Sequence, residues 1–559
     1  MTSALAATEL RPGDPIDDPR LAPPSWDADA GSTLSRVKAI GVTLVGLVAI
    51  GAYLLWLTRP DRVGNPVLYG VLLAAELFNV LQAIGFWWTC VLSRQRPRAA
   101  DRDHNHDREA LRDASRLVDV DVFIPTYSEP VDVVEPVVAA ATRMYGARVH
   151  VALLDDGNRD EMARLARRHG VAYVRRTVHS GAKAGNINHA LGVTRSPFVL
   201  VLDCDHVPAP DLLARTLPEF STRHASTGRA VAFVQTPQYY ANAPHNRIAE
   251  GSWSQQSLFF GPIARGKDAH RAMFCCGTNV VFARPALDEV GGFPETSVTE
   301  DFELSIELHE RGWESAYVPR VLASGLGPED LSAYVSQQHR WARGCVGALG
   351  RIMRARLPWR HKIQYLLSAG FFLTGWTLAV YMAMPVIRIL TGAQPIDAAS
   401  ADNFLIAFAP FFGLSLAVVA TVGAGKYTFS AYALMAATFW VHVHAGWRAV
   451  WRRPSRFVVT PKNGATGRQW RAAAPTLAVI GLLVVTAGIG LAGDRSAATL
   501  NNVAFAAFHI VVLSHGVMTA VVPRTARLTP ASPAQGGGGG LVGGVEQFDG
   551  ELVEGDVAR

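Results

Sequence analysis

Long apolar runs stand at both ends of this chain and leave a polar stretch between them. Two runs, at 37–58 and 67–92, precede the polar stretch. Four more follow it, at 363–391, 403–424, 474–492 and 502–523. Each is long enough to cross a hydrocarbon core of about 30 Å as a helix. The pattern therefore predicts six membrane spans.

The region 427–451 is also apolar but differs from these six runs. It contains His442, His444, Arg448 and three tryptophans, and Arg452-Arg453 follows it. Tryptophan and basic residues gather where a membrane meets water. We therefore expect this region to lie in the membrane interface rather than to cross the bilayer.

The stretch from 119 to about 345 has the pattern of an α/β domain. Strand-like runs at 120–124, 149–154, 199–202 and 231–235 alternate with helical patterns such as 161–169. This alternation predicts a mostly parallel, Rossmann-like sheet with helices on its faces. Ligands of such sheets bind at the carboxyl ends of the strands.

These patterns divide the chain into five parts. We predict a disordered tail (1–34), two membrane helices (35–93), the α/β domain (94–345), a membrane part (346–524) and a flexible tail (525–559). The membrane part contains interfacial helices and four spans. Basic residues are few in the loops 59–66, 392–402 and 493–501. The positive-inside rule therefore predicts an inner or plasma membrane protein whose α/β domain and both termini are cytoplasmic.

Composition agrees with a membrane protein that carries a soluble domain. The chain is 49% hydrophobic and 18% charged, with a mean hydropathy of +0.15. A net charge of +6 is modest for 559 residues and does not call for a nucleic-acid partner. The five cysteines show no paired zinc spacing, which indicates reduced thiols.

Carboxylates directly follow two of the predicted strands. Asp203 and Asp205 follow Val-Leu-Val-Leu, and Asp155-Asp156 follows Val-Ala-Leu-Leu. Two carboxylates at i and i+2 on a loop can hold one Mg²⁺ or Mn²⁺ together with a phosphate. His206 either adds a ligand or packs beside them. The Asp155-Asp156 pair can accept an N–H from a base or cap the next helix.

Two further segments bring polar groups to the same edge of the predicted sheet. Thr126, Tyr127 and Glu129 follow the first strand, where they either contact a nucleobase or form a strand-to-helix turn. The glycine-spaced segment 179–189 contains Lys183, a point charge suited to a phosphate. A solvated loop is the alternative there.

Asp301 and a helical turn at 337–341 complete the candidate chemistry. Asp301 opens an amphipathic helix, so it is either an N-cap or a general base for an attacking hydroxyl. Gln337 and Trp341 share a helix face at i and i+4, with Arg340 beside them. An indole face suits a sugar ring, and a guanidinium suits a diphosphate.

These motifs resemble those of processive family 2 glycosyltransferases, and specifically those of bacterial cellulose synthase catalytic subunits. The resemblance covers about 65–525. It rests on Asp-Asp-Gly at 155–157, Asp-Cys-Asp-His at 203–206, Thr-Glu-Asp at 299–301 and Gln-X-X-Arg-Trp at 337–341. It also includes the segments 179–188, 235–238 and 274–277, and Phe-Val-Val-Thr-Pro-Lys at 457–462, which is similar to the gating loop of the family (456–464 here).

The resemblance implies a GT-A domain that binds a UDP-sugar with Mg²⁺ (or Mn²⁺) and inverts the anomeric carbon. It makes Asp301 the base and Asp203 with Asp205 the metal ligands. It places Tyr127 and Asp156 at the uracil, with Asp155 beside them, and Lys183 and Asp203 at the sugar diphosphate. The diphosphate and the acceptor end are held by Gln337, Arg340 and Trp341, and the acceptor sugar lies near Cys276 and Gly277. The closed site is covered by Phe457, Thr460 and Lys462.

The function that this resemblance implies is polymerisation of UDP-glucose into a cellulose-like β-1,4-glucan that leaves through the membrane. The growing polysaccharide, the bilayer and an accessory synthase subunit are the expected partners. Three alternatives remain. The product could be another β-glucan or a hyaluronan-like or chitin-like polymer, the reaction could be a single transfer to a lipid acceptor, or the protein could be an inactive scaffold or a transport protein. The tail after 523 lacks an Arg-X-X-X-Arg switch and is short for a PilZ domain, so we do not expect direct control by cyclic di-GMP.

Overall fold

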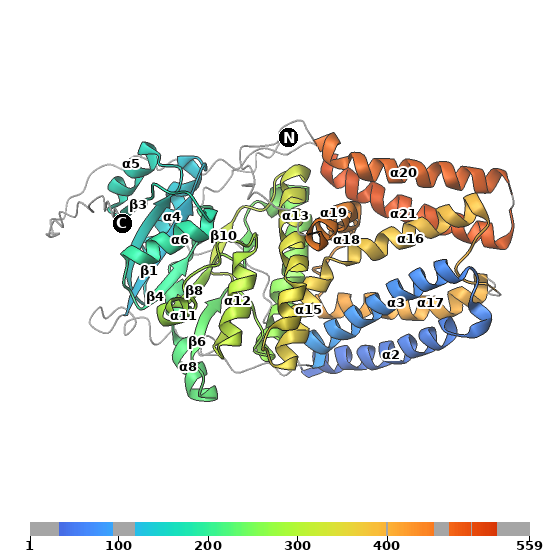
Figure 1. Cartoon of the computed structure of the whole chain (residues 1–559), viewed down its shortest axis with the longest axis horizontal. Coiled ribbons are helices and arrows are strands. Elements are labelled where there is room, and N and C mark those ends of the chain that lie inside the picture. The colour runs from blue at the N-terminus through green and yellow to red at the C-terminus, as the bar shows by residue number, and fades with distance from the viewer. Residues whose placement is uncertain (1–32, 93–117, 398–400, 452–468, 494, 522–559) are drawn as a thin grey trace, which may run out of the picture.

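The computed structural model describes residues 33–92, 118–397, 401–451, 469–493 and 495–521. An α/β domain lies at one end of the molecule and a helical bundle at the other, with shorter helices between them (Figure 1). The predicted tails lie almost wholly outside these residues. So do the 456–464 loop and the predicted site residues Phe457, Thr460 and Lys462.

The α/β domain is built on a seven-stranded sheet with the order β3-β2-β1-β4-β8-β6-β9. Its strands are β1 (Asp119–Thr126), β2 (Arg148–Asp155), β3 (Ala172–Arg175), β4 (Phe198–Val201), β6 (Val231–Gln235), β8 (Val280–Ala283) and β9 (Glu314–Tyr317). Only β8 runs antiparallel to its neighbours β4 and β6. The prediction of a mostly parallel sheet is therefore confirmed.

The reversed strand has a simple cause. Val280 pairs with Gln235, the last residue of β6, so the chain from 236 to 279 leaves and returns at the same edge of the sheet. That edge is the carboxyl end of the parallel strands, where ligands bind in α/β folds. The excursion therefore brings a loop far along the chain to the edge that holds the aspartates.

Helices cover both faces of the sheet. Val122 of β1 packs with α4 (Val131–Ala141) and α5 (Asp160–His169), whereas its neighbour Phe123 packs with α6 (Ala182–Val193), α11 (Arg284–Val290) and α12 (Glu300–Glu310). Successive strand side chains point to opposite faces, which explains this division. A small sheet of β5 (Val207–Pro208), β10 (Ala323–Gly325) and β7 (Tyr239–Tyr240) adjoins the domain.

The remaining helices of this part are short. They are α7 (Leu212–Thr216), α8 (Pro218–Thr227), α9 (Arg247–Leu258) and α10 (Ala264–Ala269). Single turns occupy Pro60–Arg62, Trp88–Leu92, Ala243–His245 and Phe259–Ile263.

Among the described residues, six helices are long and apolar enough to cross a membrane, as the sequence predicts. They are α2 (Thr33–Leu57), α3 (Pro66–Trp87), α16 (Thr374–Thr391), α17 (Ala401–Val422), α20 (Gln469–Ala492) and α21 (Ala497–Val521). The loops after α2 and α16 meet, because Val63 forms a β-bridge with Ile396. Both therefore lie at the same end of the bundle, as the charge pattern requires.

The prediction of one span over 363–391 is wrong in its bounds. The helix α15 (Trp359–Phe371) ends before α16 begins at Thr374, and only α16 is a candidate span. The break follows from a tight turn in which the Leu373 N–H donates to Gly370 O at 2.8 Å. The helix α15, whose first turn contains Arg360 and Lys362, lies beside the long helices rather than among them (Figure 1).

A layer of short helices joins the domain to the bundle (Figure 1). It contains α13 (Leu331–Gly347), α14 (Leu349–Arg354), α15, α18 (Phe429–Ala437) and α19 (Phe439–Val450). The region 427–451 thus forms two helices of 9 and 12 residues that break at Thr438. Neither is long enough to cross a bilayer, which agrees with the interfacial prediction.

A buried ion pair generates a test of this fold. Asp121 of β1 accepts hydrogen bonds from Arg284 Nη2 at 2.7 Å and from Ser196 Oγ at 2.7 Å. We expect Asp121→Ala to destabilise the protein by about 3–5 kcal/mol, because it leaves the buried Arg284 without its partner. Asp119→Ala, two residues earlier in a surface pair with Arg148, should change the melting temperature little. Equal shifts in thermal unfolding of the two variants would contradict this assignment.

Candidate functional site

The candidate site lies along the carboxyl edge of the sheet. Thr126 and Asp155 end β1 and β2 and are paired in register. Asp203 follows β4, and its N–H donates to Thr278 Oγ1 at 2.7 Å in the loop before β8. Parallel strands thus deliver side chains from distant parts of the sequence to one edge.

Asp203, Asp205 and His206 form a group that fits a divalent cation. Their ligand atoms all lie within 4.8 Å of one another. Asp205 and His206 are buried, and His206 Nδ1 is 3.2 Å from Asp205 Oδ1. His206 Nε2 is buried and has no hydrogen-bond partner among the described residues. Two carboxylates and an imidazole with an unsatisfied nitrogen suit Mg²⁺ or Mn²⁺.

The ammonium of Lys183 joins three segments of the site. It donates to Asp203 Oδ1 at 2.5 Å and to the Gly277 carbonyl oxygen at 2.7 Å. Burial opposes the charged form, but Asp203 and then Glu300 raise the pKa of Lys183 above its ordinary value. Lys183 also lies in the first turn of α6, where the helix dipole adds positive charge. The arrangement suits a phosphate group.

Asp301 lies beside this cationic group. A Cβ added at Gly277 would stand 3.0 Å from Asp301 Oδ2, and Gly277 has a left-handed φ of 81°. Burial, and then the neighbouring Glu300, raise the pKa of Asp301 to about 7, although the Phe302 N–H, Lys183 and Arg340 act against this shift. A carboxyl with such a pKa is suited to take a proton near neutral pH.

The helix α13 carries Gln337, Arg340 and Trp341 past this carboxylate. It packs so closely on Thr299 that a Cβ at Gly344 would overlap the threonine hydroxyl. Gln337 Oε1 is buried and has no partner among the described residues. The guanidinium of Arg340 lowers the pKa of Asp301. Trp341 packs with Ala342 and Phe372. The predicted helical turn is therefore present, and it lies between Asp301 and the membrane part.

Asp156 is held by Arg176 and His179, two side chains to which the sequence analysis gave no role at this carboxylate. Arg176 donates two hydrogen bonds to its carboxylate, at 2.6 and 2.8 Å, and His179 Nδ1 lies 2.9 Å away. Burial opposes ionisation, but Arg176 and His179 hold the pKa of Asp156 below its usual range. Arg176 directly follows β3, a strand that the sequence analysis did not predict, and this position at a carboxyl end is the signal that could have found it.

The carboxylate of Asp155 forms its hydrogen bonds within the protein. The buried Asp155 carboxylate accepts N–H groups of Gly157 and Arg159 and the Tyr173 hydroxyl, at 3.0, 2.5 and 2.9 Å. It therefore holds the turn that presents Asp156.

The turn after β1 is also self-contained. Glu129 Oε2 accepts the Thr126 hydroxyl at 2.9 Å and the Tyr127 N–H at 2.8 Å. Arg159 Nη2 donates to Thr126 Oγ1 at 2.8 Å. Of the three predicted contacts here, Tyr127 alone is exposed, at 52%. Its ring is thus the group that this turn offers to a ligand.

The loop with Cys276 and Gly277 is fixed by two glutamines. The Cys276 N–H donates to Gln235 Oε1 at 2.8 Å, and Gln238 Nε2 donates to the Cys276 carbonyl at 2.8 Å. Burial raises the pKa of the Cys276 thiol well above its ordinary value, so it remains a neutral thiol. The loop therefore contributes shape and backbone groups rather than a nucleophile.

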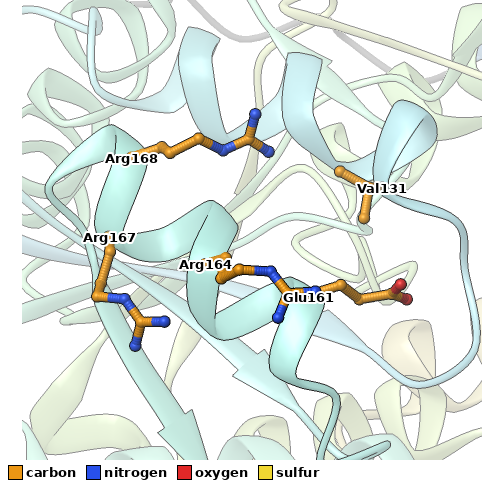
Figure 2. A pocket seen from close by; sticks show the side chains of 5 residues that line it. All are labelled: Val131, Glu161, Arg164, Arg167 and Arg168. Carbon is orange, nitrogen blue, oxygen red and sulfur yellow. The ribbon is translucent and has the colours of Figure 1, made fainter.

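A surface hollow of about 410 Å³ lies outside this edge. Val131, Glu161, Arg164, Arg167 and Arg168 line it, and four of them project from α5 (Figure 2). Arg168 also lies 3.5 Å from Glu135. None of the predicted site residues lines this hollow, so we assign no part of the chemistry to it.

Comparisons with known proteins agree with this geometry. Residues 118–344 match the family described as glycosyltransferase like family 2, and residues 288–431 match the family described as cellulose synthase. The second match spans Asp301, the whole of α13 and the first two spans after it, α16 and α17.

The chain is also similar to proteins that are named cellulose synthases. It is 33% identical over 362 residues to cellulose synthase 1 catalytic subunit [UDP-forming] of Komagataeibacter xylinus, covering 63% of this chain and 48% of the relative. It is 29% identical over 437 residues to the cellulose synthase catalytic subunit [UDP-forming] of Pseudomonas fluorescens, covering 74% and 58%. The chain thus spans about half the length of these two relatives, and 30% of a putative cellulose synthase 2 of K. xylinus.

A solved structure shows the fold. A mannosyltransferase from Pyrobaculum calidifontis, solved with GDP-Man and Mn²⁺, superposes with a TM-score of 0.50 at 17% identity, covering 69% of this chain and 100% of that one. The α/β domain therefore has the GT-A fold. The α/β domain is thus similar to the family 2 glycosyltransferases, and the region that follows it, to residue 431, is similar to the cellulose synthase family.

Proposed function

We propose that this protein is a membrane-embedded, processive, inverting glycosyltransferase that polymerises UDP-glucose into a cellulose-like β-1,4-glucan and moves it across the membrane. The single observation that carries the proposal is the position of Asp301. Its carboxylate lies against Gly277, next to the Lys183–Asp203 pair, on a helix that packs against α13.

Asp301 is the proposed general base. An acceptor hydroxyl is a poor nucleophile at neutral pH, and a nearby carboxylate of pKa about 7 can take its proton as the new bond forms. Attack from the base side, with the diphosphate leaving toward Lys183 and Arg340, inverts the anomeric carbon. Cys276 and Gly277 form the wall beside the acceptor sugar.

The leaving diphosphate is the proposed partner of the cationic side chains. Negative charge grows on it as the sugar departs, so Lys183 and Arg340 stabilise the transition state more than the ground state. Asp203, Asp205 and His206 would hold Mg²⁺ or Mn²⁺, which would supply further positive charge to the phosphates. Asp156 and the exposed ring of Tyr127 bind the uracil in this scheme.

Processivity is attributed to α13 and its neighbours. Trp341 offers an aromatic surface for the chain end, and α13 packs on α19 and α20 at the head of the bundle. A polymer held there has a short path into the membrane helices. We place the α/β domain in the cytoplasm, and Phe457, Thr460 and Lys462 over the bound nucleotide. An accessory subunit would bind the emerging polymer.

The proposed activity has a direct test. Full-length protein reconstituted in lipid should release UDP from UDP-glucose with Mg²⁺ and form a polymer whose linkage analysis shows β-1,4 bonds. UDP-GlcNAc, UDP-glucuronate and GDP-mannose serve as competing donors. A polymer from another donor would make this a different polysaccharide synthase, and a lipid carrying a single sugar would exclude processive synthesis.

The pKa of Asp301 predicts a pH dependence. Because the acid form cannot accept a proton, kcat/KM should rise with pH through about 7 and then level off. Asp301→Asn should lower kcat by about 10²–10⁴-fold on the plateau above pH 7, with a smaller difference at low pH, as expected for loss of a general base. A variant with full synthesis, or a flat profile between pH 5 and 8, would exclude this role.

The same raised pKa has a consequence for stability. The pKa of Asp301 in the folded protein lies above the ordinary value of 3.8, so the folded state is disfavoured progressively as the pH rises from about 4 through about 7. Asp301→Asn should therefore have a higher melting temperature than the wild type at pH 8, and the difference should vanish near pH 4. A lower melting temperature of the variant at pH 8 would contradict the buried charge.

The metal group generates a prediction that does not depend on turnover. Asp205→Asn should weaken Mn²⁺ binding by about 100-fold or more, since changes to groups that only support a ligand already cost 10–100-fold. Electron paramagnetic resonance of free Mn²⁺ measures this on the nucleotide-free protein. Asp211→Asn, in a surface pair with Arg215 on the same stretch of chain, is the matched control. Equal Mn²⁺ affinity of the two variants would remove Asp205 from the metal site.

A further inference from the structure

Arg176 lies between the two ends of the proposed nucleotide site. It directly follows β3 and is 7% exposed. Its Nε and Nη2 atoms donate to the Asp156 carboxylate at 2.6 and 2.8 Å. Its Nη1 and Nη2 atoms also donate to the carbonyl oxygens of Ser180 and Ala182, at 2.5 and 3.0 Å. One planar guanidinium therefore joins the proposed uracil contact to the turn at 180–182, which opens α6.

The turn that Arg176 holds has an unusual backbone. Gly181 and Ala182 are both left-handed, with φ of 69° and 46°. Glycine adopts this conformation freely, whereas alanine adopts it rarely because its Cβ crowds the backbone. Such a conformation persists only where neighbouring contacts hold it. The bonds from Arg176 to the carbonyl groups of the residues on either side of Gly181 are contacts of this kind.

Lys183 depends on this turn for its position, because it is the second residue of α6. The body of α6 is fixed separately, since Asn186 Nδ2 donates to the Leu154 carbonyl oxygen at 2.9 Å. Among the described residues, only Arg176 forms side-chain hydrogen bonds with the turn at 180–182. Arg176 therefore determines where the first turn of α6, with its ammonium group, lies relative to the sheet edge.

The packing around Arg176 leaves little room for these groups to move. A Cβ added at Gly185 would overlap the Ser180 carbonyl oxygen and stand 2.6 Å from Arg176 Nη1. On the other side, Asn158 Nδ2 donates to the carbonyl oxygen of Arg176 at 3.3 Å. Charge-assisted hydrogen bonds in such a packed site are costly to break. The Asp156 carboxylate and the first turn of α6 therefore keep one relative position.

We propose that Arg176 is a positioning residue that couples the nucleobase end of the donor site to its phosphate end, by fixing Asp156 and the first turn of α6 relative to each other. The inference rests on the proposed function, in which Asp156 binds the uracil and Lys183 the diphosphate. Four of the five N–H donors of Arg176 are already used by these bonds, so it acts through Asp156 and Lys183 rather than on the donor itself. Lysine would retain the charge but not the geometry, because bidentate pairing with a carboxylate needs the planar fork of a guanidinium.

Ligands that represent half of the donor separate the two ends of the site. Isothermal titration calorimetry on full-length protein in lipid nanodiscs, with Mn²⁺ present, measures the affinities for inorganic pyrophosphate, uridine and UDP. Arg176→Gln should weaken pyrophosphate binding by about tenfold or more, the size of one lost hydrogen bond to a charged group, and should weaken uridine binding as well. Asp156→Asn should weaken uridine binding but leave the pyrophosphate affinity within about twofold of the wild type, because the bonds from Arg176 to the turn stay in place.

Two further variants separate geometry from charge. Arg176→Lys keeps a positive charge beside Asp156 but loses the fork, so it should lose pyrophosphate affinity as Arg176→Gln does, and it carries the test if Arg176→Gln does not fold. Arg175→Gln removes the neighbouring, exposed charge and should leave all three affinities within about twofold of the wild type. If Arg176→Lys retains pyrophosphate affinity, or Arg175→Gln loses it equally, the effect is one of charge and the positioning role is wrong.

The comparison with Asp156→Asn decides whether the two ends are coupled. If Arg176→Gln weakens uridine binding alone, or if both variants lose pyrophosphate affinity equally, the bonds from Arg176 to the turn have no role in phosphate binding and the coupling is refuted. Stoichiometry and affinity are fitted separately, because a folding defect lowers the fraction of protein that binds and not the affinity of the remainder. A wild type that shows the expected pattern but makes no polymer would refute the proposed synthase and leave the coupling standing, whereas a wild type that binds neither half of the donor would refute both.

Discussion

One partly buried ammonium group connects the parts of the site. Lys183 Nζ bonds to the Asp203 carboxylate and to the Gly277 carbonyl, and so ties α6 to the loop after β4 and to the loop before β8. Those three segments meet only because β8 returns from the edge at which β6 ended. The charge of Lys183 also lowers the pKa of Asp301, and Gly277 lies against the Asp301 carboxylate, so the proposed phosphate site and the proposed base share these two residues.

The helix α13 is the mechanical link between chemistry and membrane. One of its faces lies against Thr299 through Gly344, which leaves no room for a side chain, and therefore follows any movement of the Thr-Glu-Asp turn. It also packs on α19 and α20. The helix therefore connects the turn that carries the proposed base to the helices of the membrane part.

Sequence reasoning was most accurate where one pattern implied one structure. Apolar alternation placed β1, β2, β4 and β6 within about two residues, and length with hydropathy predicted six spans. It left alternatives open where a side chain could serve either the protein or a ligand. For Asp155 and Glu129 a turn and a nucleotide contact were both possible. Both carboxylates accept hydrogen bonds from neighbouring donors, and their contact with a nucleotide stays a prediction. The run 363–391 was read as one helix because hydropathy does not register the turn at Gly370–Leu373.

The sequence by itself determined the order of spans, the α/β class and the carboxylates that follow the strands, because these depend on periodicity and on neighbours along the chain. Only the tertiary structure decided which polar groups meet. Arg176 on Asp156, the cationic groups around Asp301 and the buried, unsatisfied nitrogen of His206 result from contacts across the sheet edge. Burial and pairing of charges depend on groups far apart in sequence, and it is these that assign a carboxylate to a turn, a metal or a proton transfer.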